Sequence, residues 1–212
     1  MRADTAEAFE CCIAEGGVAL FGADTVYGLA CDPRSTAAVA RLYELKGRPA
    51  DKPAAVMFFT VSPALAAMRQ LGSQTRAAVE ALLPGALTLL LPNPGGLFPL
   101  ACGPDPGTLG LRVPVLPALA GVGVPVLQSS ANLSGGAEAR SLADVAPHIR
   151  DGADLVLDGR TLPGTPSTVV DLRSYEADRA WSVLREGAVP RDVLTRLLRS
   201  REPPSQPPDG VP

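Results

Sequence analysis

Short apolar runs alternate with segments of helical periodicity along most of the chain, and this alternation limits the possible folds more than any other feature. The runs VALF at residues 18–21, AAVMFF at 54–59 and ALTLLL at 86–91 have the length and character of buried strands. Further strands are predicted at residues 109–113, 124–128, 154–157, 168–172 and 182–184. Because helices that alternate with strands pack as layers on a sheet, the sequence predicts an α/β fold.

Capping and stop signals mark the helices between these strands. Ser35 is a typical N-cap for a segment whose apolar face includes Leu42, and Gly47 ends that segment. A first helix is expected to start at Asp4 or Thr5 and to end at Gly16. The other predicted helices follow residue 62, span 73–83, follow residue 141 and span 191–198.

Length and composition indicate one folded domain. The chain has 212 residues, of which 46% are hydrophobic and 19% charged, so it can bury a large core. Residues 1–200 are predicted to form this domain. The tail at 201–212 is rich in proline, has almost nothing to bury, and is predicted to be disordered.

Charge and cysteine content exclude several classes of protein. A net charge of −3 argues against a chain that coats nucleic acid, which takes a broad basic face. The four cysteines form no CxxC pair, so a reducing cytoplasm is predicted, without disulfides or structural zinc. No signal peptide is recognised at the N-terminus. The apolar segment 109–127 is divided by Pro114, Pro117 and Pro125 into pieces too short for a bilayer of roughly 30 Å, so no membrane partner is expected.

Polar groups gather in loops beside the predicted strands. Lys46, Arg48 and Lys52 lie within seven residues, directly before the apolar run at 54–59, and solubility alone does not require cations so close together. Small hydroxyls and amides occur in ADTVYG, SSANLSGG and GTPSTVV, which also adjoin strands. Loops at strand ends form the ligand crevice of open α/β sheets. Taken singly, each of these loops also suits ordinary turns and solvated surface.

Taken together and in order, these loops and strands resemble the YrdC-like threonylcarbamoyl-AMP synthases. The resemblance extends from about residue 18 to residue 187. It is carried by DTVYGL, LKGRPADKP, PGALTLLL, LGLRVP, SSANLSG, PSTVVDL and LREG. It implies a single-domain YrdC-like fold, a twisted open mixed sheet with flanking helices and a concave basic active site.

The resemblance also implies an activity. Members of this family are nucleotidyltransferases that convert L-threonine, bicarbonate and ATP into threonylcarbamoyl-AMP and pyrophosphate, the first step towards threonylcarbamoyladenosine in tRNA. Magnesium is expected with ATP, held largely by the phosphates, and no organic cofactor beyond the substrates is expected. Transfer RNA and the downstream threonylcarbamoyl-transferase proteins are candidate partners.

Site residues follow from the matching motif positions. Lys46 and Arg48 of the K-x-R motif are implied as catalytic, because cations offset the repulsion between the carbamate and the α-phosphate. The implied ATP-binding residues are Lys46, Arg48, Lys52, Thr108, Ser130, Asn132 and Arg185. The implied threonine-binding residues are Thr25, Arg112 and Ser167, where an arginine fork suits a carboxylate. For Arg112 an internal salt bridge to Asp24 or Asp171 is the alternative, since the residue lies inside an apolar run.

Some positions differ from the usual family pattern. Gly22 and Ala23 replace a proline and a threonine, and Met57 stands where a polar residue or histidine is common. Glu138 occupies the place of a small hydroxyl residue near the nucleotide, and Pro166 replaces a glutamate before Ser167. These differences bear on substrate affinity more than on the type of reaction.

Two other functions remain open from the sequence. One is a YrdC-like module that binds RNA without chemistry, and the other is a paralogue that uses another carbamoyl-adenylate substrate. A serine hydrolase is disfavoured, because the chain has one histidine, His148, on a predicted surface helix, and lacks a GxSxG elbow. No P-loop or GxGxxG is present, so a nucleotide site would be of another kind.

Overall fold

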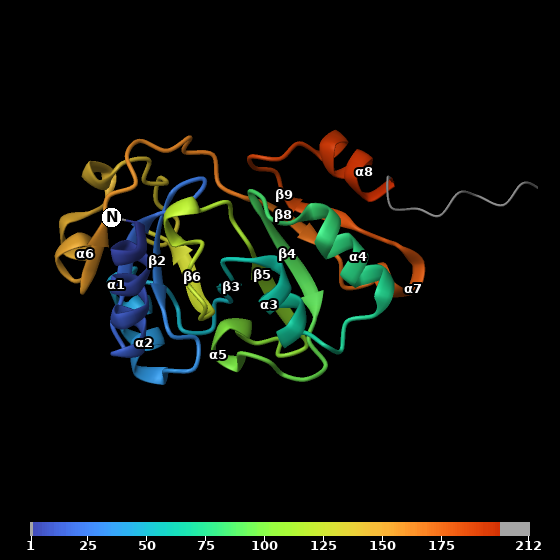
Figure 1. Ribbon diagram of the computed structural model, residues 1–212, viewed down its shortest axis with the longest axis horizontal. Coiled ribbons are helices and arrows are strands. Elements are labelled where there is room, and N and C mark those ends of the chain that lie inside the picture. Colours follow the sequence, from blue (N-terminus) through green and yellow to red (C-terminus); the bar gives the residue numbers. More distant parts are fainter. Residues whose placement is uncertain (1, 200–212) are drawn as a thin grey trace, which may run out of the picture.

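The computed structural model describes residues 2–199, with side chains from residue 5 onward. The tail predicted to be disordered, residues 201–212, lies outside the described residues. Within them, helices and strands alternate as the sequence predicts (Figure 1). The helices are α1 Arg2–Ala14, α2 Thr36–Leu45, α3 Val61–Ala67, α4 Ser73–Leu82, α5 Pro99–Cys102, α6 Pro147–Asp151, α7 Tyr175–Asp178 and α8 Arg191–Arg199, with 3-10 turns η1 Pro117–Leu119 and η2 Leu142–Asp144.

One mixed sheet of nine strands runs through the described chain, in the order β7-β1-β2-β6-β3-β5-β4-β8-β9. The pairs β1 with β7, β3 with β5 and β4 with β8 are parallel, and the other neighbours are antiparallel. The strands are β1 Ala19–Gly22, β2 Tyr27–Cys31, β3 Ala55–Met57, β4 Leu87–Pro92, β5 Thr108–Arg112, β6 Val126–Ser130, β7 Leu155–Leu157, β8 Thr168–Asp171 and β9 Ser182–Arg185. The α/β class, the mixed sheet and the flanking helices are thus confirmed.

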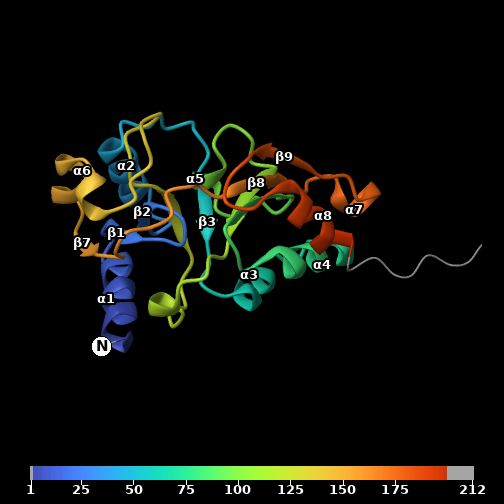
Figure 2. The same ribbon diagram turned by 90° about the horizontal axis from the view of Figure 1, so that it is seen from above.

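Alternate residues of the central strands enter two different apolar clusters. Leu20 and Leu29 belong to the larger cluster with α2, whereas Phe21 and Ala30 belong to the smaller cluster with Phe9 of α1. Figure 2 shows α1 and α2 on opposite sides of β1 and β2. Because successive side chains of a strand point to opposite faces, a strand covered on both sides must be apolar throughout. This explains why runs such as VALF show no polar alternation.

Strand β2 is an element that the loop interpretation of ADTVYG missed. The structure confines the loop to the residues between Gly22 and Tyr27, which pair with each other at the end of the β1–β2 hairpin. All five residues of β2 are buried. In isolation the short run YGLAC resembles a turn, because it contains a glycine. Its antiparallel neighbours β1 and β6 supply all the pairing that makes it a strand.

Helix α2 begins and ends as predicted, and its end sets the position of Lys46. The Ser35 side chain accepts a hydrogen bond from the Ala38 N–H at 3.2 Å. Lys46 is the C-cap, and Gly47 follows with φ of +55°, a conformation that favours glycine. The first helix starts at Arg2, before the cap that was predicted at Asp4 or Thr5. No helix within residues 2–199 has the length and apolar character needed to cross a membrane.

Candidate functional site

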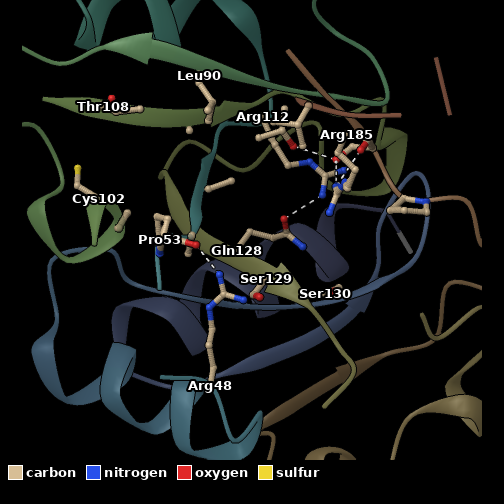
Figure 3. A pocket seen from close by; sticks show the side chains of 18 of the residues that line it. Arg48, Pro53, Leu90, Cys102, Thr108, Arg112, Gln128, Ser129, Ser130 and Arg185 are labelled. Carbon is tan, nitrogen blue, oxygen red and sulfur yellow. Dashed lines mark hydrogen bonds between the residues drawn. The ribbon is translucent and has the colours of Figure 1, made fainter. Parts of the chain in front are cut away.

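A pocket of about 380 Å³ opens where several loops and strands of the sheet meet. Figure 3 shows Arg48 on one side, Arg112 and Arg185 on the other, and Gln128 between them. The lining also includes the acids Asp105 and Glu138, together with small hydroxyl residues, among them Thr25, Ser129, Ser130 and Ser167. Such a mixture of apolar walls with a few convergent polar groups is typical of a binding site for a small molecule.

Arg112, at the end of β5, is buried with only 5% of its surface exposed. Its Nη2 pairs with Asp24 Oδ1 at 2.8 Å, and its Nη1 donates to Gln128 Oε1 at 2.9 Å. Burial lowers the pKa of Arg112 and raises that of Asp24, while each charge offsets part of the shift of the other. The salt bridge to Asp24 is the alternative that the sequence left open, whereas Asp171 pairs with Arg173.

Unpartnered polar atoms surround this arginine. Thr25 Oγ1, Arg112 Nε and Gln128 Nε2 are buried at the pocket and have no hydrogen-bond partner among the described residues. Buried polar groups in folded proteins nearly always have a partner. These donors are therefore suited to a polar ligand, and a carboxylate or carbamate would accept from them.

Ser167 and Arg185 form a second polar group on the same side of the pocket. Arg185 Nη2 donates to the Ser167 carbonyl at 2.8 Å and lies 3.3 Å from Ser167 Oγ. Thr88 Oγ1 is 2.9 Å from the same hydroxyl. Arg185 lowers the pKa of Arg112 further, as expected for two cations that face one pocket. The two arginines can thus act on one anion.

Arg48 reaches the pocket from the loop after α2. Its guanidinium lies over the Tyr43 ring, 5.6 Å from the centroid, and its Nη2 donates to the Pro53 carbonyl. Arg48 Nε is buried without a partner among the described residues. Tyr43 in turn donates to the Lys52 carbonyl at 2.9 Å, which fixes the same loop. A half-buried arginine with a free donor suits a phosphate group.

The structure brings seven of the ten predicted site residues together in the pocket lining, and it places the other three around it. Lys46 is buried beneath the turn at 130–136 and donates to it. Lys52 is exposed on the loop, and Asn132 lies in the turn itself, where it accepts from Lys46 and Ser130. The seven lining residues are Thr25, Arg48, Thr108, Arg112, Ser130, Ser167 and Arg185.

Gln128 is a site residue that the sequence interpretation missed. It lies in β6, is 3% exposed, and holds Arg112. A polar residue at the end of the apolar run VPVLQ was the available signal, since a buried amide needs a partner. Its partner Arg112 lies 16 residues earlier, in β5, so the contact follows only from the arrangement of the strands in the sheet.

The pocket acids differ in their surroundings. Asp105 accepts from Thr108 Oγ1 at 2.6 Å and from the Gly107 N–H at 3.0 Å. Glu138 Oε2 is buried with no hydrogen-bond partner among the described residues. No group of three or more histidine, cysteine, aspartate or glutamate side chains that could hold a metal ion occurs in the described part of the chain. Protein ligands alone therefore form no metal centre there.

A family model and several curated proteins match this chain, and they point to the same family. A family model described as Sua5_yciO_yrdC, telomere recombination, matches residues 11–187. A threonylcarbamoyl-AMP synthase of Bacillus subtilis (strain 168) is 34% identical over 192 residues, which are 87% of this chain and 54% of that protein. One of Xanthomonas campestris pv. campestris (strain B100) is 37% identical over 153 residues, 69% of this chain and 81% of that protein. The chain thus spans about half the length of the Bacillus relative.

Solved structures agree with the sequence relatives. The structure of P. abyssi Sua5 H234A/Y235A superposes with a TM-score of 0.80 at 27% identity, over 92% of this chain and 60% of that chain. P. abyssi Sua5 complexed with L-threonine gives a TM-score of 0.77 at 27% identity, over 93% and 58%. E. coli YciO, at 24% identity and a TM-score of 0.74, shares the fold. With a family model that covers most of its length and relatives above 30% identity, this chain belongs to the Sua5/YciO/YrdC family.

Proposed function

We propose that this chain is a threonylcarbamoyl-AMP synthase, which forms threonylcarbamoyl-AMP and pyrophosphate from L-threonine, bicarbonate and ATP. The observation that carries the proposal is the pocket in which seven of the residues that the family resemblance implies for substrate binding converge from distant segments. The names of the curated relatives and the threonine complex of P. abyssi Sua5 support the same conclusion.

The reaction has two bond-forming steps. The threonine nitrogen attacks the carbon of bicarbonate, an N–C bond forms, and water leaves, which gives a carbamate. A carbamate oxygen then attacks the α-phosphorus of ATP, the bond to the β-phosphate oxygen breaks, and pyrophosphate departs. In the proposed arrangement Arg112, Thr25 and Ser167 bind threonine, while Arg48, Thr108 and Ser130 bind the nucleotide.

Catalysis in this site rests mainly on position and charge. Carbamate and phosphate are both anions, and cations in a pocket partly closed to water offset their repulsion more effectively than at an exposed surface. Arg48 faces Arg112 and Arg185 across the pocket, so an anion between them meets positive charge from both sides (Figure 3). His148 is exposed on α6, away from the pocket lining, and takes no part in the proposal.

Magnesium would accompany the nucleotide. Because the described side chains form no metal cluster, the phosphates would supply most of its ligands. The ion would neutralise part of the charge on the departing pyrophosphate. All four cysteines are free thiols, which suits the cytoplasm as the place of the reaction. Transfer RNA and the downstream transferase proteins are proposed as later users of the product.

The decisive experiment measures pyrophosphate release from ATP and identifies the adenylate by mass spectrometry. The proposal predicts that release requires threonine and bicarbonate together. Release with another amino acid in place of threonine would show a paralogue with a shifted substrate. Salt-sensitive RNA binding with no turnover would replace the synthase by an RNA-binding module.

A further inference from the structure

Lys46 is a buried cation whose side-chain amine makes all of its hydrogen bonds to one turn, at residues 130–136. The residue is 1% exposed. Its Nζ donates to the Ser130 carbonyl, to the Asn132 carbonyl at 2.7 Å and to Asn132 Oδ1 at 3.3 Å. An ammonium group has three N–H donors and no acceptor, so these three oxygens account for all of its donors.

The main chain of Lys46 holds the same turn from its other end. The Ser134 N–H donates to the Lys46 carbonyl at 3.0 Å. Within the turn, Ser130 Oγ donates to Asn132 Oδ1 at 2.5 Å, and Asn132 Nδ2 donates to the Gly136 carbonyl at 2.6 Å. Lys46 therefore links the C-terminus of α2 to the whole segment 130–136, which begins at the last residue of β6.

Arg48, two residues later, is arranged in the opposite way. It lines the pocket, and its Nε has no partner among the described residues. Lys46 does not line the pocket and has no donor left over. The two cations of one short motif thus differ in what they can offer a ligand.

We propose that Lys46 is a positioning residue, which fixes the turn at 130–136 so that Ser130 faces the nucleotide, while Arg48 binds the phosphates directly. The identity of the ligand rests on the proposed function, whereas the hold on the turn does not. Loss of Lys46 should loosen the segment 130–136. It should weaken the binding of all nucleotides equally, because the turn would then be disordered in the ligand-free protein whatever the number of phosphates on the ligand.

The electrostatic surroundings agree with this role. Burial, together with the nearby charges of Arg48 and Lys52, lowers the pKa of Lys46 to about 8, and Glu138 opposes the shift. The amine thus remains mostly charged at neutral pH, despite its burial. Three acceptors with no donor among them suit the charged form, since a neutral amine would direct its lone pair at an oxygen.

The first test measures amide hydrogen exchange in the ligand-free protein. Lys46→Met keeps most of the length of the side chain and removes its donors. We expect faster exchange in residues 130–136 and unchanged exchange in β4 and β5. Lys52→Met is the matched control, because it removes the same charge from an exposed residue of the same loop. Unchanged exchange in the turn of Lys46→Met would overturn the proposal.

The second test compares adenosine, AMP and ATP as ligands of the wild type, Lys46→Met and Arg48→Met. For Lys46→Met we expect about the same loss of affinity, roughly tenfold, for all three ligands. For Arg48→Met the loss should increase with the number of phosphates. A loss for Lys46→Met that increases from adenosine to ATP in the same way would show a direct phosphate contact and overturn the proposal.

A third measurement separates positioning from general damage to the fold. In Lys46→Met the KM for ATP should rise by about tenfold while the KM for threonine stays within about twofold. An equal rise of both would contradict the proposal. If Lys46→Met does not fold, Lys46→Gln, which keeps two donors, takes its place in each test. A wild type that makes no threonylcarbamoyl-AMP would remove the proposed function, yet hydrogen exchange would still decide the role of Lys46.

Discussion

Two buried cations flank the candidate site, and they are stabilised in different ways. The amine of Lys46 is surrounded by two main-chain carbonyls and an amide oxygen, all of them neutral. The guanidinium of Arg112 meets the carboxylate of Asp24 and the amide of Gln128. Among the described residues no carboxylate contacts the Lys46 amine directly, whereas Asp24 pairs directly with the Arg112 guanidinium.

The difference indicates how each region meets a ligand. On the Lys46 side, a nucleotide would meet the turn that Lys46 holds in place, and the direct contact to phosphate would come from Arg48. At the Arg112 side, a threonine carboxylate would share the guanidinium with Asp24, using Nε and the remaining Nη hydrogens. The expected arginine fork is thus already half occupied in the ligand-free protein.

The largest effect is expected when the Arg112 pair is broken. Arg112→Met leaves Asp24 buried without its cation, which costs roughly 3 to 5 kcal/mol of unfolding free energy. For a chain of this size each kcal/mol lowers Tm by roughly 2 to 4 °C. Thermal melts of the ligand-free protein measure the loss. Asp24→Asn in the same background should recover much of it, and a double variant no more stable than Arg112→Met would refute the pair's contribution.

The pH dependence of the stability of Arg112→Met tests the direction of the pKa shift of Asp24. Burial already raises the pKa of Asp24 in the wild type, and loss of Arg112 removes the main opposing charge. A carboxyl group with a raised pKa binds more protons in the folded state, so its contribution to stability falls as pH rises through that range. Arg112→Met should therefore be less destabilised at pH 5 than at pH 7.

The next largest effect concerns Arg48, which lines the pocket and has no carboxylate partner among the described residues. Arg48→Ala should reduce threonine-dependent pyrophosphate release about a hundredfold, the usual scale for one lost contact to charge in a preorganised site. The melting temperature should change little, because Arg48 is only half buried. Steady-state kinetics measure the change in pyrophosphate release. Lys52→Ala is the comparison, because it removes the same charge from an exposed residue. Wild-type turnover in Arg48→Ala would contradict its placement.

Alkaline pH tests the Lys46 side without any substitution. The pKa of Lys46 is lowered to about 8, so the amine is charged below that pH and neutral above it. ATP affinity in the absence of threonine should fall roughly tenfold between pH 7 and 9, as one donor and the charge disappear. Cys12, Cys31 and Tyr27 have raised pKa values of about 11 to 12 and do not titrate there.

The stability of the folded protein should instead rise with pH, over the range from about pH 8 to 10.5. Because the unfolded chain binds more protons than the folded one between pH 8 and the ordinary lysine value of 10.5, this group makes stability rise with pH there. A loss of ATP affinity without a loss of stability would thus identify Lys46, whose charged neighbours are Arg48, Lys52 and Glu138. The same pH effect in Lys46→Gln would assign it to another group.

The smallest effect is expected for Glu138, the pocket acid without a hydrogen-bond partner among the described residues. Glu138→Gln removes a negative charge that faces the polyanionic nucleotide, so the KM for ATP should fall by a few-fold, on the order of 1 kcal/mol or less. Kinetics at fixed magnesium measure the change. If the variant instead needs more magnesium, Glu138 holds the metal.

Local signals in the sequence predicted most of the fold. Ser35 and Gly47 bound α2 where expected, and the apolar runs became strands within one or two residues. Capping and burial of a short run depend on neighbouring residues, so they can be predicted locally. Strand β2 was missed because its strand character comes from pairing with β1 and β6, which no local pattern reveals.

By itself, the sequence determined the α/β class, the family resemblance and seven of the residues that line the pocket. Those properties depend on residue type and order along the chain. Only the tertiary structure decided which of these residues face the pocket and what each one contacts. The partners of Lys46, Ser130 and Asn132, lie more than 80 positions away, and Asp24 and Gln128 reach Arg112 from two other strands and loops. The stabilisation of a buried charge depends on hydrogen-bond and ion-pair partners from distant segments, and these cannot be identified from the neighbouring sequence.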